Sequence, residues 1–202
     1  MKSLKRIVSL GLIIALTFSL CGCGNKVPEN TVFSVDDLPG KIIGVQLGTT
    51  GDIYASDYEA EGSTIERFNK GNDAVLALKQ GKVDCVIIDE QPAKAFVEKY
   101  DDLKILEEDF ALEEYAIVVS KENKELTEKI NAVIAQLKEE LVLDQIVANY
   151  IGDETKGTCP YESPADVDRS NGTLVMATNA AFEPYEFYDD NEIVGIDVDL
   201  AQ

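Results

Sequence analysis

The sequence contains no histidine among its 202 residues. Histidine is the most common general base and the most common metal ligand, so its absence excludes Ser-His-Asp catalysis, Cys-His catalysis and most zinc sites. Cysteine is also scarce, because the chain has only four and they do not form two metal-binding pairs. We therefore expect no catalytic residue, no metal site and no cofactor.

Basic residues are few, with 18 Lys and Arg against 38 Asp and Glu, and the formal net charge is -20. Proteins that bind nucleic acid contact phosphates through clustered Lys and Arg, and this sequence has no such cluster. Nucleic acid is therefore excluded as a partner. The acidity indicates a soluble exterior, and a hydrophobic content of 45% is enough for one ordinary domain or two small ones.

One long apolar run, residues 7–20, follows a basic start at the N-terminus. It is too short for a membrane span, which needs about 20 apolar residues, and therefore predicts a signal peptide over residues 1–23. The ending Leu20-Cys21-Gly22-Cys23 resembles the bacterial lipobox. That resemblance implies a lipidated Cys23 that anchors the protein to the outside of the cell membrane. An ordinary cleaved signal peptide is the alternative, and residues 24–32 are predicted to be a tether.

An apolar strand pattern at residues 42–47 leads into a turn of small residues and then into a helix pattern at 52–60. The turn consists of Gly48, Thr49, Thr50 and Gly51. Unpaired N–H groups at a helix start, the helix dipole and the threonine hydroxyls would suit an anion there. A tight turn between strand and helix is the alternative interpretation.

Strand and helix patterns then alternate, which predicts an α/β fold with a parallel sheet. The strands are expected at residues 64–68 and 83–88, and the helices at 73–80, capped by Asn72, and at 92–100. Further strands are expected at 103–106 and 115–120, and helices over 123–150 with a break near residues 139–140.

Asp89 follows the strand at residues 83–88, as the Gly48-to-Gly51 turn follows the strand at 42–47. Ligands of parallel sheets sit beyond the carboxyl ends of the strands, so we expect both features on one rim. The turn would bind a carboxylate and Asp89 an ammonium group, which together match a zwitterion. Alternatively, Asp89 caps the next helix.

Three motifs resemble the second lobe of the polar amino-acid-binding proteins of bacterial ABC importers. They are residues 37–51 (DLPGKIIGVQLGTTG), 71–78 (GNDAVLAL) and 81–89 (GKVDCVIID). Residues 114–119 (EYAIVV) and the helices up to residue 152 resemble the return of the chain into lobe one. The resemblance implies a periplasmic-binding-protein-like lobe, a membrane permease as partner, and roles for Thr49 and Thr50 at the ligand carboxylate and for Asp89 at its amino group.

The order of the pieces departs from this family, because the beginning of lobe one does not precede residues 33–112. Instead, a linker at 153–171 leads into residues 172–187 (GTLVMATNAAFEPYEF) and 195–200 (GIDVDL), which resemble the start of lobe one. The resemblance places Asn179 and Phe182 at ligand-contacting positions, although in a tandem protein they would serve a different pocket.

The domain prediction is lobe two at residues 33–112, the C-terminal part of lobe one at 113–152, and an incomplete second lobe-one segment at 172–202. A fragment of a tandem protein, a deletion remnant and a circular permutant are the three accounts of this order. The arginine that clamps the ligand in the family has no counterpart, since Arg6, Arg67 and Arg169 lie outside matching motifs.

We expect a lipoprotein of the amino-acid-binding type that makes or breaks no bond. Because its site is incomplete, this chain alone should bind a polar amino acid weakly or undetectably. An enzyme on the same fold, either dehydratase-like or peptidoglycan-cleaving, and a sensory domain are the alternatives. We also expect residues 173–177 to add as a strand beside 115–119, because a parallel edge would otherwise stay open.

Overall fold

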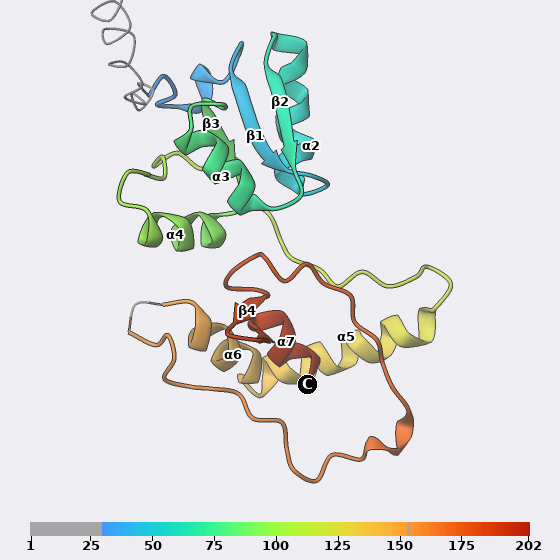
Figure 1. Ribbon diagram of the computed structural model, residues 1–202. Helices are drawn as coiled ribbons and strands as arrows, with labels where there is room; N and C mark the ends of the chain where they lie inside the picture. Colours follow the sequence, from blue (N-terminus) through green and yellow to red (C-terminus); the bar gives the residue numbers. More distant parts are fainter. Residues whose placement is uncertain (1–29, 153) are drawn as a thin grey trace, which may run out of the picture.

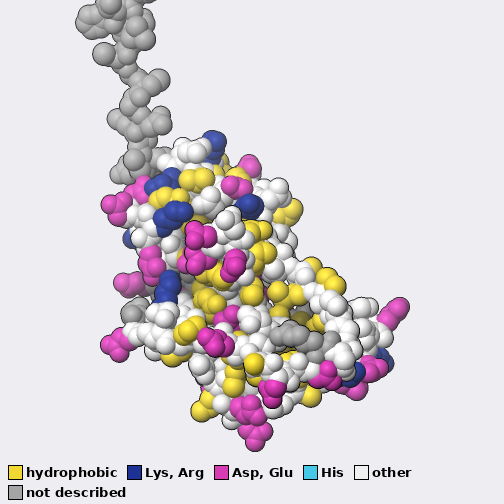
Figure 2. Space-filling view, turned by 60° about the horizontal axis from the view of Figure 1, so that its bottom comes forward, with side chains coloured by type: hydrophobic (Ala, Val, Ile, Leu, Met, Phe, Trp, Pro, Cys, Tyr) yellow, Lys and Arg dark blue, Asp and Glu magenta, His cyan; other side chains and the backbone are white. Residues whose placement is uncertain are grey.

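The structure is a computed structural model that describes residues 30–152 and 154–202. The predicted signal peptide and Cys23 lie outside these residues. The described chain has a part that contains a three-stranded sheet, residues 30–112, and a mainly helical part that begins at residue 113. The first part is at the top of Figure 1 and the second is at the bottom. Asp and Glu side chains are spread over the face shown in Figure 2. None of the described helices is long and apolar enough to cross a membrane.

The sheet of the first part has three parallel strands in the order β2-β1-β3. They are β1 (Ile42–Gln46), β2 (Thr64–Phe68) and β3 (Cys85–Ile87). The central strand β1 is buried on both faces from its second residue onward, as expected for a strand inside a parallel sheet. The predicted parallel sheet is confirmed.

Three helices accompany these strands: α2 (Thr50–Asp57), α3 (Gly71–Lys79) and α4 (Glu90–Lys99). Both α2 and α3 pack against β1. The helices begin up to two residues earlier than the sequence patterns predicted, and the N-cap of α3 is Lys70 where Asn72 was expected. Two short 3₁₀ helices, Val35–Asp37 and Tyr58–Glu61, complete this part.

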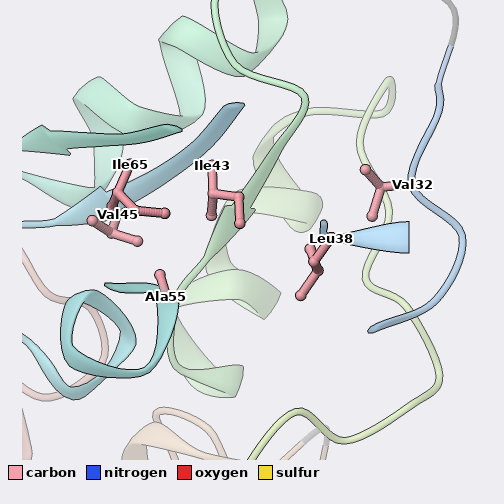
Figure 3. Close-up of a cluster of buried hydrophobic side chains, with 6 residues drawn as sticks. All are labelled: Val32, Leu38, Ile43, Val45, Ala55 and Ile65. Atoms are coloured by element: carbon pink, nitrogen blue, oxygen red, sulfur yellow. The ribbon is translucent and has the colours of Figure 1, made fainter. Parts of the chain in front are cut away.

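The hydrophobic core of the first part joins the sheet to α2 and to the segment that precedes β1 (Figure 3). Its buried members are Val32, Leu38, Ile43, Val45, Ala55 and Ile65. Burial of an aliphatic side chain of this kind contributes about 1.5–3 kcal/mol, so this cluster holds β1 and its loop in place.

The second part contains α5 (Lys124–Glu139), α6 (Val142–Tyr150) and α7 (Ile196–Ala201). The predicted break between the first two helices is confirmed, at Leu141 with its left-handed φ of 60°. A short hairpin of β4 (Phe187–Asp189) and β5 (Glu192–Val194) precedes α7. A 3₁₀ turn at Arg169–Asn171 lies in the preceding connection.

Three predicted strands do not form, namely residues 103–106, 115–120 and 173–177. The predicted pairing of 173–177 beside 115–119 is therefore wrong in this structure. Val118 is 94% exposed and Val175 84% exposed. A β-branched sequence favours an extended chain, but a strand also needs a hydrogen-bonding partner, and neither segment has one here.

Candidate functional site

The loop after β1 is held by hydrogen bonds within the loop itself. The Gly48 N–H donates to Oδ2 of Asp52 at 2.9 Å, and Gly48 has the left-handed φ of +78° that favours glycine. The Thr49 hydroxyl donates to the Gln46 carbonyl at 2.8 Å and accepts from the Asp52 N–H at 3.4 Å. Thr49 is thus the N-cap of α2, and its side chain forms hydrogen bonds within the loop.

Gly51 and Thr50 make different contacts with the rest of the chain. A Cβ on Gly51 would lie 3.1 Å from the Ile87 carbonyl oxygen, so glycine allows α2 to pack closely on the end of β3. Thr50 is exposed, and its hydroxyl points away from the loop to donate to the carboxylate of Glu113. Thr50 is therefore the loop residue whose side chain is directed toward another part of the chain.

Arg67 on β2 is committed to the same loop and does not act as a free cation. Its Nε lies 2.7 Å from Oδ1 of Asp52, and its guanidinium also contacts Ser56 and Glu59. The Gly48 N–H, followed by Arg67, lowers the pKa of the Asp52 carboxyl below its ordinary value, despite the opposing effect of burial. Arg67 thus stiffens the loop, in accord with its place outside the ligand-clamping motif.

Asp89 follows β3 and occupies the N-cap position of α4, yet its side chain makes no capping hydrogen bond. The carboxylate instead accepts a hydrogen bond from the Tyr115 hydroxyl. Partial burial, together with this bond, raises the pKa of the Tyr115 phenol well above its ordinary value. The alternative capping role for the Asp89 side chain is therefore wrong in this structure, and the carboxylate faces the second part of the molecule.

An aromatic group lies next to Asp89. The Tyr115 ring stacks on Tyr185 with 4.4 Å between centroids, and Tyr185 stacks on Phe182 at 5.9 Å. The structure thus connects Phe182 to Asp89 through two tyrosines. Asn179 is exposed, and its side chain makes no hydrogen bond with the described residues.

Four contributors to this site were missed by sequence reasoning: Tyr54, Glu113, Tyr115 and Tyr185. Glu113 lies at the start of the predicted C-terminal part of lobe one, and Tyr115 in a predicted strand. The nearby Glu113 carboxylate also raises the pKa of the Tyr54 phenol. The three-residue spacing of Phe182 and Tyr185 was an available signal, but nothing local marks Glu113.

The two cysteines in the described part of the chain are not bonded to each other. Cys85 packs against the core, and burial raises the pKa of its thiol to about 12. Such a thiol is a poor nucleophile at neutral pH. Cys85 therefore acts as a small hydrophobic residue at the edge of the core.

A parallel sheet flanked by helices, with a polar loop after β1 and a carboxylate after β3 that faces the second part of the molecule, defines part of a periplasmic-binding-protein fold. Several solved structures share it. The P235GK mutant of ArgBP from T. maritima is 40% identical with a TM-score of 0.56, over 62% of this chain and 54% of that one. An ancestral arginine-binding protein bound to arginine is 35% identical with a TM-score of 0.57, over 63% and 57%.

Over part of its length, the chain is homologous to the amino-acid-binding proteins of ABC transporters. The L-cystine-binding protein TcyJ of Escherichia coli K12 is 28% identical over 133 residues, which cover 65% of this chain and 50% of TcyJ. The chain spans about half the length of the curated relatives it matches. No protein-family model matches the sequence.

Proposed function

We propose that this protein is the extracytoplasmic substrate-binding component of an ABC importer for a polar amino acid. It binds the amino acid and presents it to a membrane permease without making or breaking a bond. The lipobox-like residues 20–23 support a signal peptide and a membrane anchor at Cys23. The relatives named above are binding proteins, which supports a binding role over the enzyme and sensory alternatives.

The observation that carries this proposal is the position of the Asp89 carboxylate, which lies at the carboxyl end of β3 and does not cap α4. The loop with the Thr50 hydroxyl follows β1, the strand that pairs with β3, so both groups lie at the same rim of the sheet. The N–H groups of Thr50 and Gly51 open α2 and have no acceptor within that helix. The rim thus supplies donors for a carboxylate and an acceptor for an ammonium group.

The surroundings of Asp89 favour an amino acid with a polar or cationic side chain. Aromatic faces such as those of Tyr115, Tyr185 and Phe182 attract a guanidinium or ammonium group. The net charge of -20 favours the approach of cations. Related ancestral arginine-binding proteins have been solved with arginine and with glutamine, so L-arginine is the first ligand to test.

Isothermal titration calorimetry with L-arginine, L-glutamine and L-cystine tests the proposal. We expect weak binding of at least one of them, with a Kd of about 1 mM. Asp89→Asn should abolish it, because the ammonium group loses its charged acceptor. Asp101→Asn is the matched control, since Asp101 is an exposed aspartate that makes no side-chain hydrogen bond within the described chain. Absence of binding, or binding that survives Asp89→Asn, would overturn the proposal.

A further inference from the structure

We propose that residues 113–115 act as an internal competitor that occupies the amino-acid site in the ligand-free protein. This inference rests on the proposed function and deepens it. The carboxylate of Glu113 takes the place of a ligand carboxylate, and the hydroxyl of Tyr115 takes the place of a ligand ammonium group. An amino acid must displace both groups before it can bind.

The first contact is at the loop end of the site. Thr50 donates its hydroxyl to Glu113, and the same carboxylate raises the pKa of the Tyr54 phenol on the same helix. Both residues belong to α2, whose first turn is the predicted carboxylate-binding feature. The chain therefore supplies its own carboxylate where a ligand carboxylate is expected.

The second contact is at the acidic end of the site. Asp89 accepts its hydrogen bond from the hydroxyl of Tyr115, which is a donor as an ammonium group would be. Tyr115 is held in this position by its stacking on Tyr185. The carboxylate assigned to the ligand amino group is thus already satisfied by a group of the chain.

Both contacts come from one short segment of the chain. Glu113 and Tyr115 are two residues apart, so their Cα atoms are at most about 7 Å from each other. A segment this short bridges Thr50 at one end and Asp89 at the other. The segment thus offers a carboxylate at one contact and a hydrogen-bond donor at the other, as a zwitterionic amino acid does.

Apart from the stacking of Tyr115 on Tyr185, little apolar burial holds this segment in place. Leu112 is 99% exposed and Ile117 is 51% exposed, on either side of the two contacts. Displacing the segment therefore exposes little additional aliphatic surface, so its hydrophobic cost is small. A tethered group of this kind competes at an effective concentration in the millimolar range, which lowers the apparent affinity for a free ligand.

The test is calorimetric titration of L-arginine into the full chain and three single variants. Glu113→Ala removes the internal carboxylate, and we expect its Kd to fall about tenfold. Tyr115→Phe removes the donated hydroxyl but keeps the ring that stacks on Tyr185, and we expect a smaller fall. Glu114→Ala is the matched control, because this neighbouring glutamate is exposed and makes no side-chain hydrogen bond within residues 30–152 and 154–202.

The outcomes separate the two proposals. Equal Kd values for the wild-type chain, Glu113→Ala and Tyr115→Phe would overturn the competitor while leaving the proposed function standing. A Kd that rises in Glu113→Ala would show that Glu113 assists the ligand, and it would also overturn the competitor. Failure of every variant to bind L-arginine and the other amino acids would overturn the proposed function and this inference with it.

Discussion

The two parts of the molecule are built from similarly apolar sequence but bury it to different extents. In residues 30–112 the sheet and its helices enclose a core that includes Ile43 and Val45, both fully buried. In residues 113–202 the longest helix, α5, has no buried residue, and Ile146 and Ile196 are the buried aliphatic side chains. The difference shows that strand-like and amphipathic patterns produce a packed core only where other elements cover them.

The same contrast holds for buried carboxyl groups. In the first part, Asp52 is paired with Arg67 and with the Gly48 N–H, so its charged form is stabilised. In the second part, Glu186 is buried beside another acid, Asp197. Ionisation of Asp52 therefore stabilises the first part, whereas ionisation of Glu186 destabilises the second part.

The largest expected effect is a loss of stability when a core side chain of the first part is truncated, compared with a truncation in the second part. Ile43→Ala in β1 should lower the free energy of unfolding by about 2–5 kcal/mol, because it leaves a cavity in a closed core. Ile117→Ala, at a half-exposed position in the second part, should change it by less than about 0.5 kcal/mol. Urea unfolding of both variants measures the difference, and equal losses would show that residues 113–120 are packed in solution.

A smaller effect concerns pH. Burial, and then the charge of Asp197, raises the pKa of Glu186 from 4.5 to about 8. A carboxyl group whose folded pKa is raised costs nothing below its unfolded pKa, and it destabilises the fold increasingly as pH rises from 4.5 to 8. Glu186→Gln stays neutral and should flatten this fall in stability.

The matched control for this pH experiment is Glu192→Gln, at an exposed position on β5. Urea unfolding of each variant at several values between pH 4.5 and 8 gives the slope. Asp52 does not contribute in this window, because its lowered pKa means that its stabilisation is lost only as pH falls below 3.8. A slope that persists in Glu186→Gln would assign the pH dependence to another group.

The smallest expected effect concerns a single hydrogen bond within the helical part. The Tyr150 hydroxyl on α6 donates to Oδ2 of Asp199 on α7 at 2.9 Å. Tyr150→Phe should cost about 1–2 kcal/mol, because Asp199 is buried and loses a partner. Tyr188→Phe, on an exposed ring of β4, should cost less than about 0.5 kcal/mol in the same unfolding measurement. No difference between the two variants would show that α6 and α7 are not coupled through this bond.

The sequence allowed correct prediction where local pattern and tertiary packing agree. The strand at Thr64–Phe68 has the predicted bounds, and β1, α3 and β3 lie where apolar periodicity and the glycines indicated. Asn123 caps α5 by accepting from the Leu126 N–H at 3.2 Å, as residue type and position favour. Each of these features depends on neighbours close in sequence or on a nearby strand.

The failures share a different cause. Residues 115–120 and 173–177 have strand propensity, but propensity does not provide the second backbone that a strand requires. The contact between Thr50 and Glu113 joins residues 63 positions apart, and no local pattern could identify it. Thr50 and Asp89 were singled out from the sequence, and the groups that satisfy them in this structure became visible only with the fold.

The stacked pair Tyr115 and Tyr185 also gives the protein an optical property. The chain has eight tyrosines and no tryptophan, so its intrinsic fluorescence comes from tyrosine alone. A phenol that donates to a carboxylate, as Tyr115 does to Asp89, emits weakly because proton transfer in the excited state quenches it. Any event that moves Tyr115 away from Asp89 should brighten the emission of the unlabelled protein, so the site carries its own reporter of occupancy.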